Sequence, residues 1–183
     1  MKKAYLKTAL LALAACFALS AVSCRRAEPL PEPTEIPIVT PDPDDVFGLT
    51  KDVFGEHVAF ADYSEKDVVM INFWETWCGP CMGEMADLEA LYEEHESEGF
   101  AIIGVYSSSK TADVKAVAEN FGITYRLVPT TRQLRRFATR YVPTTVFVNG
   151  KGELLSEEPI VGAKSRSEWE EIISSLLQNT GRG

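Results

Sequence analysis

The feature that most constrains this chain is an apolar run, VVMINF, that leads directly into WETWCGPC. Such a run without alternation is typical of a strand buried on both faces of a sheet. After Cys78, apolar side chains recur with helical spacing to about Glu98, where Gly99 ends the pattern. Cys78 and Cys81 are therefore expected at a turn between a buried strand and a helix.

The rest of the domain alternates further strands with further helices and has a closing hairpin, which predicts an α/β or α+β sandwich around one sheet. A capping box, Ser165-x-x-Glu168, opens the last helix, which should end near Gln178. The predicted strands are 68–73, 100–106 and 125–128, the helices are 111–121 and 131–141, and the hairpins are Leu49–Asp52 with Glu56–Phe60 and Thr144–Val148 with Gly152–Leu155.

The charge balance argues against a nucleic-acid partner. Among 183 residues, 18 are basic and 27 acidic, for a net charge of −9. The basic residues form no cluster outside the N-terminus that resembles a nucleic-acid footprint. Four arginines (132, 135, 136 and 140) are interpreted as the solvated face of one helix.

Residues 1–24 read as a signal peptide of the lipoprotein type. Three lysines precede an apolar stretch, Thr8–Val22, which is too short for a comfortable membrane span. The segment ends in AVSC, which resembles a bacterial lipobox and makes Cys24 the preferred lipidation site. The alternative is LAAC ending at Cys16, and a soluble secreted protein is the third interpretation.

Residues 25–45 form a predicted tether, because six prolines stand among acidic residues with little to bury. Such sequence favours an extended, semi-rigid spacer. The folded domain is expected over residues 46–183. Export with lipidation of Cys24 would leave Cys78 and Cys81 as the free thiols, and outside the cytosol such a pair is oxidised unless something reduces it.

Metal binding by the cysteine pair is disfavoured. A structural zinc site needs four ligands, but there is no second C-x-x-C pair. The histidines, His57 and His95, are interpreted as ordinary surface or half-buried residues. Copper chaperones of the Sco type need C-x-x-x-C and a distal histidine, which this sequence lacks. We predict no metal and no organic cofactor.

A purely structural disulfide is also a weak interpretation. A bridge between residues three apart closes a very small loop and removes little entropy from the unfolded chain. At a helix start, however, free N–H groups and the helix dipole stabilise a Cys78 thiolate. Pro80 suits the first turn. Cys81, further into the helix and more buried, can resolve a mixed disulfide at an exposed Cys78.

The motif WCGPC, preceded by NFW and followed by VPTTVFV, resembles the thioredoxin superfamily over residues 46–178. The resemblance implies a thioredoxin-like fold: a central mixed sheet flanked by helices. It also implies a redox-active Cys78–Cys81 disulfide around Gly79 and Pro80. Pro143 would be a cis proline against that disulfide. Trp77 would be an exposed aromatic beside the site, whereas Trp74 belongs to the core.

Within the superfamily the chain is most similar to the membrane-tethered TlpA/ResA-like group. The lipoprotein-like signal, the N-terminal hairpin, CMGEMADLEAL and a central insertion over Ser107–Val128 carry this resemblance. Asn72 replaces the buried aspartate of cytoplasmic thioredoxins, and Glu84 lies where the group has a glutamate near the thiols. We hypothesise that Glu84 handles the proton, the alternative being a solvated helix carboxylate. Glu75, where many relatives have Ala or Gly, receives no role.

The resemblance implies an envelope thiol–disulfide oxidoreductase, mainly a reductase of disulfides in exported proteins. Apocytochrome c would be one substrate class, and an upstream membrane thiol reductant would regenerate the pair. An oxidase or isomerase with the same cysteines is the alternative, which the Gly-Pro dipeptide disfavours. A peroxidase or a non-catalytic docking module fits the intact WCGPC less well. The predicted location is the bacterial cell envelope, with the chain lipid-anchored.

Overall fold

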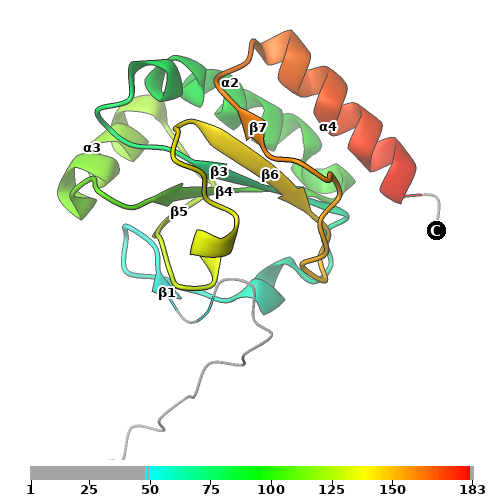
Figure 1. The fold of residues 1–183 in the computed structure, drawn as a ribbon, viewed down its shortest axis with the longest axis horizontal. Helices are drawn as coiled ribbons and strands as arrows, with labels where there is room; N and C mark the ends of the chain where they lie inside the picture. Colours follow the sequence, from blue (N-terminus) through cyan, green and yellow to red (C-terminus); the bar gives the residue numbers. More distant parts are fainter. Residues whose placement is uncertain (1–47, 49, 182–183) are drawn as a thin grey trace, which may run out of the picture. The chain divides into compact units, whose positions relative to one another are not determined.

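The computed structural model describes residue 48 and residues 50–181, and its centre is a five-stranded mixed sheet. The strands lie in the order β5-β4-β3-β6-β7, with β3, β4 and β5 parallel and β6 and β7 antiparallel to their neighbours (Figure 1). The sheet strands are β3 (Val68–Phe73), β4 (Phe100–Tyr106), β5 (Arg126–Pro129), β6 (Thr144–Val148) and β7 (Ile160–Val161), and the α-helices are α2 (Gly79–His95), α3 (Thr111–Phe121) and α4 (Arg166–Thr180). This arrangement confirms the predicted α/β, thioredoxin-like fold.

Shorter elements complete the described part of the chain. The predicted N-terminal hairpin is present as β1 (Thr50–Lys51) and β2 (His57–Val58). The predicted central insertion is α3 with β5. Single 3₁₀ turns are η1 (Phe60–Tyr63), η2 (Glu96–Glu98) and η3 (Leu134–Arg136).

The two faces of the sheet bury two hydrophobic clusters, because side chains alternate along each strand. Val68 and Met70 of β3 face a cluster that contains Met85 of α2 and Trp169 of α4. The intervening side chain, Val69, and the next one, Ile71, face the cluster beneath η1 and η3. Helices α2 and α4 therefore cover one face, while short segments cover the other (Figure 1).

Local signals set the ends of α2. Cys78 has extended backbone and is the N-cap, and Pro80 lies in the first turn, where a missing N–H costs nothing. The helix passes into η2 and stops at Gly99, whose φ of 91° is a left-handed conformation that favours glycine. The active-site turn is thus held between a buried strand and a well-anchored helix.

The predicted helix over residues 131–141 is wrong: only η3 is helical there. Threonine side chains offer the backbone other partners, since Thr131 Oγ1 accepts from Leu134 N–H and Thr139 Oγ1 accepts from Tyr141 N–H. Val142 precedes a proline, which also disfavours helical backbone. The four arginines remain exposed, but on an irregular segment.

The closing hairpin is only partly as predicted. Asn149 makes the expected turn, with its Oδ1 accepting from the N–H groups of Lys151 and Glu153. The returning segment contributes a single bridge, Val148 to Leu154, and the strand that pairs with β6 is β7. Between them lies a run with two glutamates and a proline, Glu157–Pro159, which suits a strand poorly.

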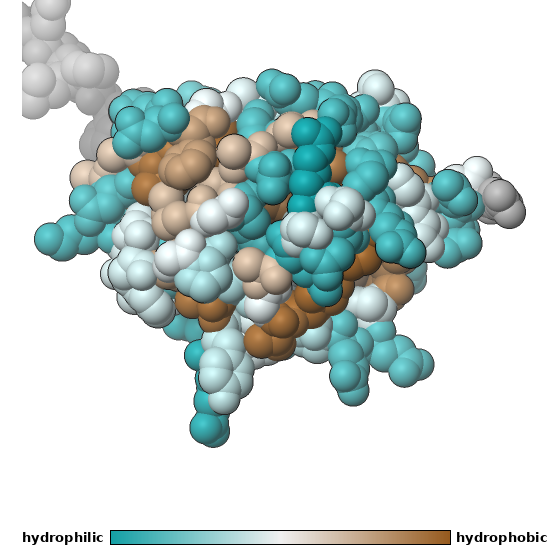
Figure 2. Space-filling view, turned by 90° about the horizontal axis from the view of Figure 1, so that it is seen from above, coloured by the Kyte–Doolittle hydropathy of each residue, from teal (hydrophilic) through white to brown (hydrophobic). Residues whose placement is uncertain are grey.

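The predicted signal peptide, the tether and both candidate lipidation sites, Cys16 and Cys24, lie outside the described residues. Within residues 50–181, none of the helices combines the length and the apolar composition that a membrane span needs. Figure 2 shows one face of the molecule as largely hydrophilic, with hydrophobic areas interspersed.

Candidate active site

The cysteine pair lies at the turn that joins β3 to α2. Cys78 and Cys81 form a disulfide with 5.3 Å between their Cα atoms. The backbone N–H of Cys81 donates to Cys78 Sγ at 3.2 Å. A sulfur at a helix start that accepts an N–H bond is stabilised when it becomes a thiolate.

The two sulfurs differ in access, but less than the sequence suggests. Cys78 is 5% exposed and Cys81 fully buried. The nucleophile predicted to be exposed is therefore nearly covered in this disulfide form. Gly79 and Pro80 between the cysteines are exposed, so the site faces solvent through them.

A proline loop packs against the disulfide. The Val142–Pro143 peptide bond is cis, and the Val142 carbonyl oxygen lies 3.6 Å from Cys78 Sγ. Pro143 O accepts from Gly162 N–H at 2.9 Å, which ties the loop to the residue that follows β7. Among the described residues the Val142 N–H has no partner. The loop thus offers a backbone donor next to Cys78.

The two tryptophans of the motif have opposite environments. Trp74 is 1% exposed and packs in the core, as predicted. Trp77 is 68% exposed, and its Nε1–H donates to Ser108 Oγ at 3.0 Å. Trp77 therefore presents a broad aromatic surface beside the cysteines while its polar edge is bonded.

Glu84 is buried one helical turn after Cys81, so the interpretation as a solvated carboxylate is wrong. Its carboxylate accepts from Trp169 Nε1 at 3.1 Å, from Lys164 N–H at 3.2 Å and from Asn72 Nδ2 at 3.3 Å. Burial raises the pKa of Glu84, and these hydrogen bonds oppose but do not cancel it.

The partners of Glu84 come from two distant parts of the chain, β3 and the start of α4. Asn72 lies on β3 and also donates to Thr145 Oγ1 at 3.0 Å. Trp169 projects from α4, and Lys164 precedes it. Sequence reasoning singled out Glu84 and Asn72 but missed Trp169, Lys164 and Thr145, for which no local motif exists.

Glu75 is a second buried carboxylate, three residues before Cys78. It accepts five hydrogen bonds of 2.5–2.8 Å from the backbone and hydroxyl groups of Ser107–Ser109 at the end of β4. Burial alone would raise the pKa of Glu75, but the bonds from Ser109 and Ser107 outweigh it and lower the pKa to about 2. Three consecutive serines after a buried parallel strand were the available signal for this contact, and sequence reasoning missed it.

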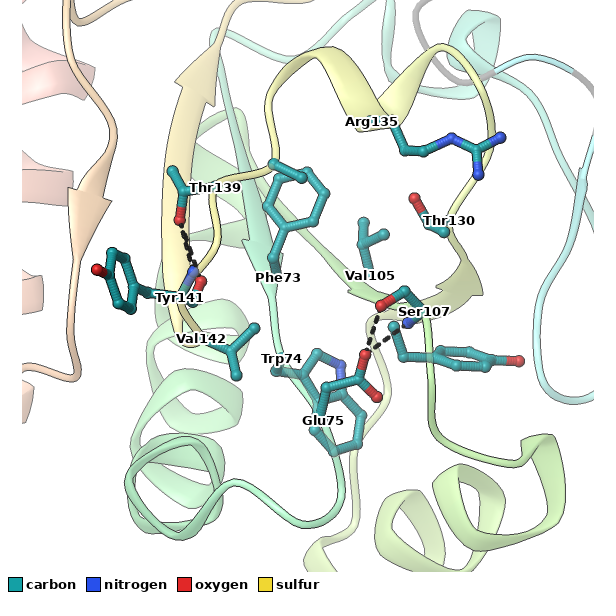
Figure 3. A pocket seen from close by; sticks show the side chains of 12 residues that line it. Phe73, Trp74, Glu75, Val105, Ser107, Thr130, Arg135, Thr139, Tyr141 and Val142 are labelled. Carbon is teal, nitrogen blue, oxygen red and sulfur yellow. Dashed lines mark hydrogen bonds between the residues drawn. The ribbon is translucent and has the colours of Figure 1, made fainter.

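A pocket of about 270 Å³ opens beside this turn (Figure 3). Phe73, Val105 and Val142 provide apolar walls, while Glu75 and Arg135 lie on its lining. Because Val142 lines the pocket and also contacts Cys78, the pocket adjoins the Cys78 sulfur.

The histidines lie apart from the cysteines. His57 is exposed, and His95, near the end of α2, bonds to Glu98 at 2.9 Å and Glu170 at 3.1 Å. Glu94, His95 and Glu170 place possible metal-ligating atoms within 4.8 Å of one another. Both imidazole nitrogens already face carboxylates, an arrangement that favours the protonated ring. Burial lowers the pKa of His95, but these bonds leave it raised.

Comparison with known proteins gives a consistent result. A model of the AhpC/TSA family matches residues 43–155. The thiol-disulfide oxidoreductase ResA of Geobacillus kaustophilus is 31% identical over 147 residues, which cover 79% of this chain and 81% of that protein. The ResA of Geobacillus thermodenitrificans is 28% identical over the same shares.

A solved structure agrees with these sequence relatives. The thiol:disulfide interchange protein of the thioredoxin family from Chlorobium tepidum has a TM-score of 0.66 and 26% identity, covering 75% of this chain and 97% of that one. These relatives are named as thiol–disulfide oxidoreductases or interchange proteins, and this chain holds a disulfide-bonded cysteine pair. The chain therefore belongs to the AhpC/TSA family and is a thioredoxin-like thiol–disulfide oxidoreductase of the ResA type.

Proposed function

We propose that this oxidoreductase acts mainly as a reductase of disulfides in exported proteins. The observation that carries the proposal is the Cys78 sulfur at the start of α2, bonded by the Cys81 N–H and flanked by Val142. The Gly-Pro dipeptide between the cysteines supports the reducing direction, because it resembles reducing members of the superfamily.

The reaction has two exchange steps. In the reduced enzyme the Cys78 thiolate attacks one sulfur of a substrate disulfide, and the other substrate sulfur leaves as a thiolate. The Cys81 thiol then loses its proton, and its thiolate attacks Cys78 Sγ. The second substrate sulfur leaves as a thiolate, and the Cys78–Cys81 disulfide seen here is formed. Two electrons pass to the substrate, and an upstream thiol reductant must return them.

Glu84 is the proposed acceptor of the Cys81 proton. It lies three residues further along α2, on the same helical side. A carboxylate with a raised pKa is a better base near neutral pH than an ordinary one. Asn72 can hold this carboxylate but cannot itself exchange a proton.

The substrate segment is proposed to lie between Trp77 and the Val142–Pro143 loop. The unpaired Val142 N–H can bond to a substrate carbonyl. Trp77 offers apolar contact area, and the adjoining pocket can take a substrate side chain. Apocytochrome c, whose cysteines need reduction, is a proposed substrate class.

The proposed location is the bacterial cell envelope. A signal peptide over residues 1–24, a lipid on Cys24 (Cys16 as the alternative) and a tether over 25–45 would hold domain 46–183 near a membrane. Mass spectrometry of the exported chain tests this directly. A diacylglyceryl group should disappear in Cys24→Ala, and its retention there would favour Cys16.

The test of direction is the reduction potential of the Cys78–Cys81 couple in the purified full chain. A reductase should have a value near that of thioredoxin, about −270 mV. A value near that of a strong oxidant such as DsbA, about −120 mV, would reverse the proposed direction.

A further inference from the structure

The carboxylate of Glu75 organises the loop that follows β4. Its Oε1 accepts from Ser107 N–H, Ser107 Oγ–H and Ser108 N–H, and its Oε2 accepts from Ser109 N–H and Ser109 Oγ–H. Figure 3 shows the contacts with Ser107. All five donors come from one three-residue turn, so the ionised carboxylate fixes that turn as a unit.

The hydrogen bonds of Ser109 connect this turn to Thr76, the residue just before Trp77. A serine hydroxyl has one proton, and an ionised carboxylate can only accept. Ser109 must therefore give its proton to Glu75, which leaves its oxygen to accept from Thr76 N–H at 2.9 Å and from Thr76 Oγ1 at 3.1 Å. Glu75 thus fixes the direction of the bond between the two hydroxyls, in which Thr76 donates and Ser109 accepts.

Trp77 is connected to the same turn. The N–H of Ser108 is held by Glu75, and the Ser108 hydroxyl oxygen accepts from Trp77 Nε1 at 3.0 Å. An indole that is 68% exposed has little packing to restrain it, so this bond restrains its orientation. A side chain ordered in advance loses less entropy when a partner binds.

We propose that Glu75 is a positioning residue that, through Ser108, holds Trp77 as a preformed contact for the polypeptide around a substrate disulfide. The inference rests on the proposed function and adds the group that sets its preference for protein over small disulfides. Glu75 acts on substrate affinity and leaves the exchange of sulfurs to the cysteines.

A matched control for buried carboxylates is available on α2. Glu89 is buried and accepts from Thr124 N–H and Thr124 Oγ1. It lies eleven residues after Cys78, about 16 Å along a helix axis. Loss of Glu89 should perturb the fold as a lost buried bond does, without reaching Trp77.

The experiment uses the full chain and compares wild type with Glu75→Ala, Ser108→Ala, Trp77→Phe and the control Glu89→Gln. Steady-state reduction of insulin, a protein disulfide, is measured beside reduction of a small symmetrical disulfide. Acrylamide quenching of fluorescence reports on Trp77, because Trp74 and Trp169 are buried. Ser108→Ala keeps the experiment decisive if Glu75→Ala fails to fold, because Ser108 is exposed.

We expect Glu75→Ala and Ser108→Ala to raise KM for insulin roughly three- to tenfold, the factor that one lost hydrogen bond carries, with kcat within about twofold. Quenching should increase in both variants, and Glu89→Gln should change neither quantity. Ser108→Ala combined with Trp77→Phe should equal Trp77→Phe alone, because without the indole N–H the Ser108 hydroxyl has no bond to Trp77 left to lose.

Unchanged KM and quenching in Glu75→Ala would overturn the inference, and so would an equal loss with the small disulfide. If the wild-type chain fails to reduce insulin, the proposed function fails. The quenching comparison still decides in that case whether Glu75 positions Trp77.

Discussion

Two buried carboxylates flank the cysteine pair, and their acidities move in opposite directions. Glu75 and Glu84 are both 2% exposed. The pKa of Glu75 is lowered to about 2, whereas that of Glu84 is raised. Burial alone therefore does not decide what a carboxylate does in this site.

The difference lies in the donors. Glu75 accepts five bonds of 2.5–2.8 Å, three of them from backbone N–H groups of one turn. Glu84 accepts three longer bonds, one from β3 and two from the start of α4. Bonds to the ionised form lower a carboxyl pKa, and desolvation raises it. The five short bonds to Glu75 outweigh the effect of burial on its pKa, whereas the three longer bonds to Glu84 do not.

The two carboxylates, Glu75 and Glu84, are suited to different chemistry. A carboxylate that stays ionised at every ordinary pH cannot exchange protons, but its hydrogen bonds can fix the conformation of a loop. A carboxylate whose pKa is raised can trade them with a neighbouring thiol. The chain thus places a carboxylate held in its ionised form before Cys78, and a carboxylate with a raised pKa, the proposed acceptor of the Cys81 proton, after Cys81.

The largest expected effect is on stability, in Glu75→Gln. A glutamine has one acceptor oxygen, so its NH₂ group must face donors, and a backbone N–H such as that of Ser109 cannot reverse. A pKa displaced from 4.5 to about 2 corresponds to ~3 kcal/mol. We expect a loss of this order in the free energy of unfolding at pH 7, measured by urea denaturation.

The pH dependence of that loss is fixed by the sign of the shift. A lowered folded pKa gives stability that is present above the unfolded value of 4.5 and is lost as pH falls toward about 2. The gap between wild type and Glu75→Gln should thus be constant above pH 5 and shrink below it. A gap that stays constant down to pH 2 would show that the charge is irrelevant.

The next effect is kinetic, in Glu84→Gln. This substitution keeps the shape of the side chain and should also keep its hydrogen bonds. The Asn72 amide can flip to accept from the glutamine NH₂ group, and the Thr145 hydroxyl can then donate to Asn72. The rate of disulfide exchange at pH 7 should fall roughly tenfold, below the usual range for acid–base catalysis, since water can still take the Cys81 proton. Measuring the rate from pH 5 to 9 should reveal the loss of one titration limb.

Stability should respond oppositely in this variant. A raised carboxyl pKa means that ionisation costs native stability as pH rises from 4.5 through the folded value. The free energy of unfolding of Glu84→Gln should therefore rise relative to that of the wild type over that pH range. An unchanged pH–rate profile would remove Glu84 from the proton path, and Glu89→Gln is the matched control.

The comparison also explains what the sequence could predict. The strands, the helix start at Cys78 and the capping box at Ser165 depend on local patterns, and they were predicted. The cis proline followed from the resemblance of VPTTVFV. These features need only neighbouring residues or a known motif.

The features that were missed depend on contacts distant in sequence. Glu75 is 32–34 residues from its serine donors, and Glu84 is 85 from Trp169. No periodicity encodes such pairs. The predicted helix over 131–141 failed for a related reason: Thr139 bonds to Thr144 at 2.7 Å, and so commits the segment to the proline loop.

A smaller effect should follow from Trp169→Phe, which tests whether the hydrogen-bond donors around Glu84 set its pKa. The variant removes one donor and keeps an aromatic ring beside Phe147. Losing a bond that favours the ionised form should raise the pKa of Glu84 further, moving the associated limb of the pH–rate profile upward by up to about one unit. A downward shift, or none, would show that the number of donors does not set this acidity.

The smallest effect should come from His95→Gln, which tests charge-assisted bonds outside the core. His95 bonds to Glu98 and Glu170, whose side chains are 59% and 41% exposed. Its folded pKa is raised above 6.5, so the stabilisation is complete below pH 6.5 and is lost as pH rises through the folded value. Exposed pairs contribute little, so we expect less than about 1 kcal/mol at pH 5.5 and none at pH 9. Urea denaturation at both values measures this. A loss as large as that of Glu75→Gln would mean that burial of the carboxylate adds nothing to its bonds, and the contrast between the two sides of the motif would need another cause.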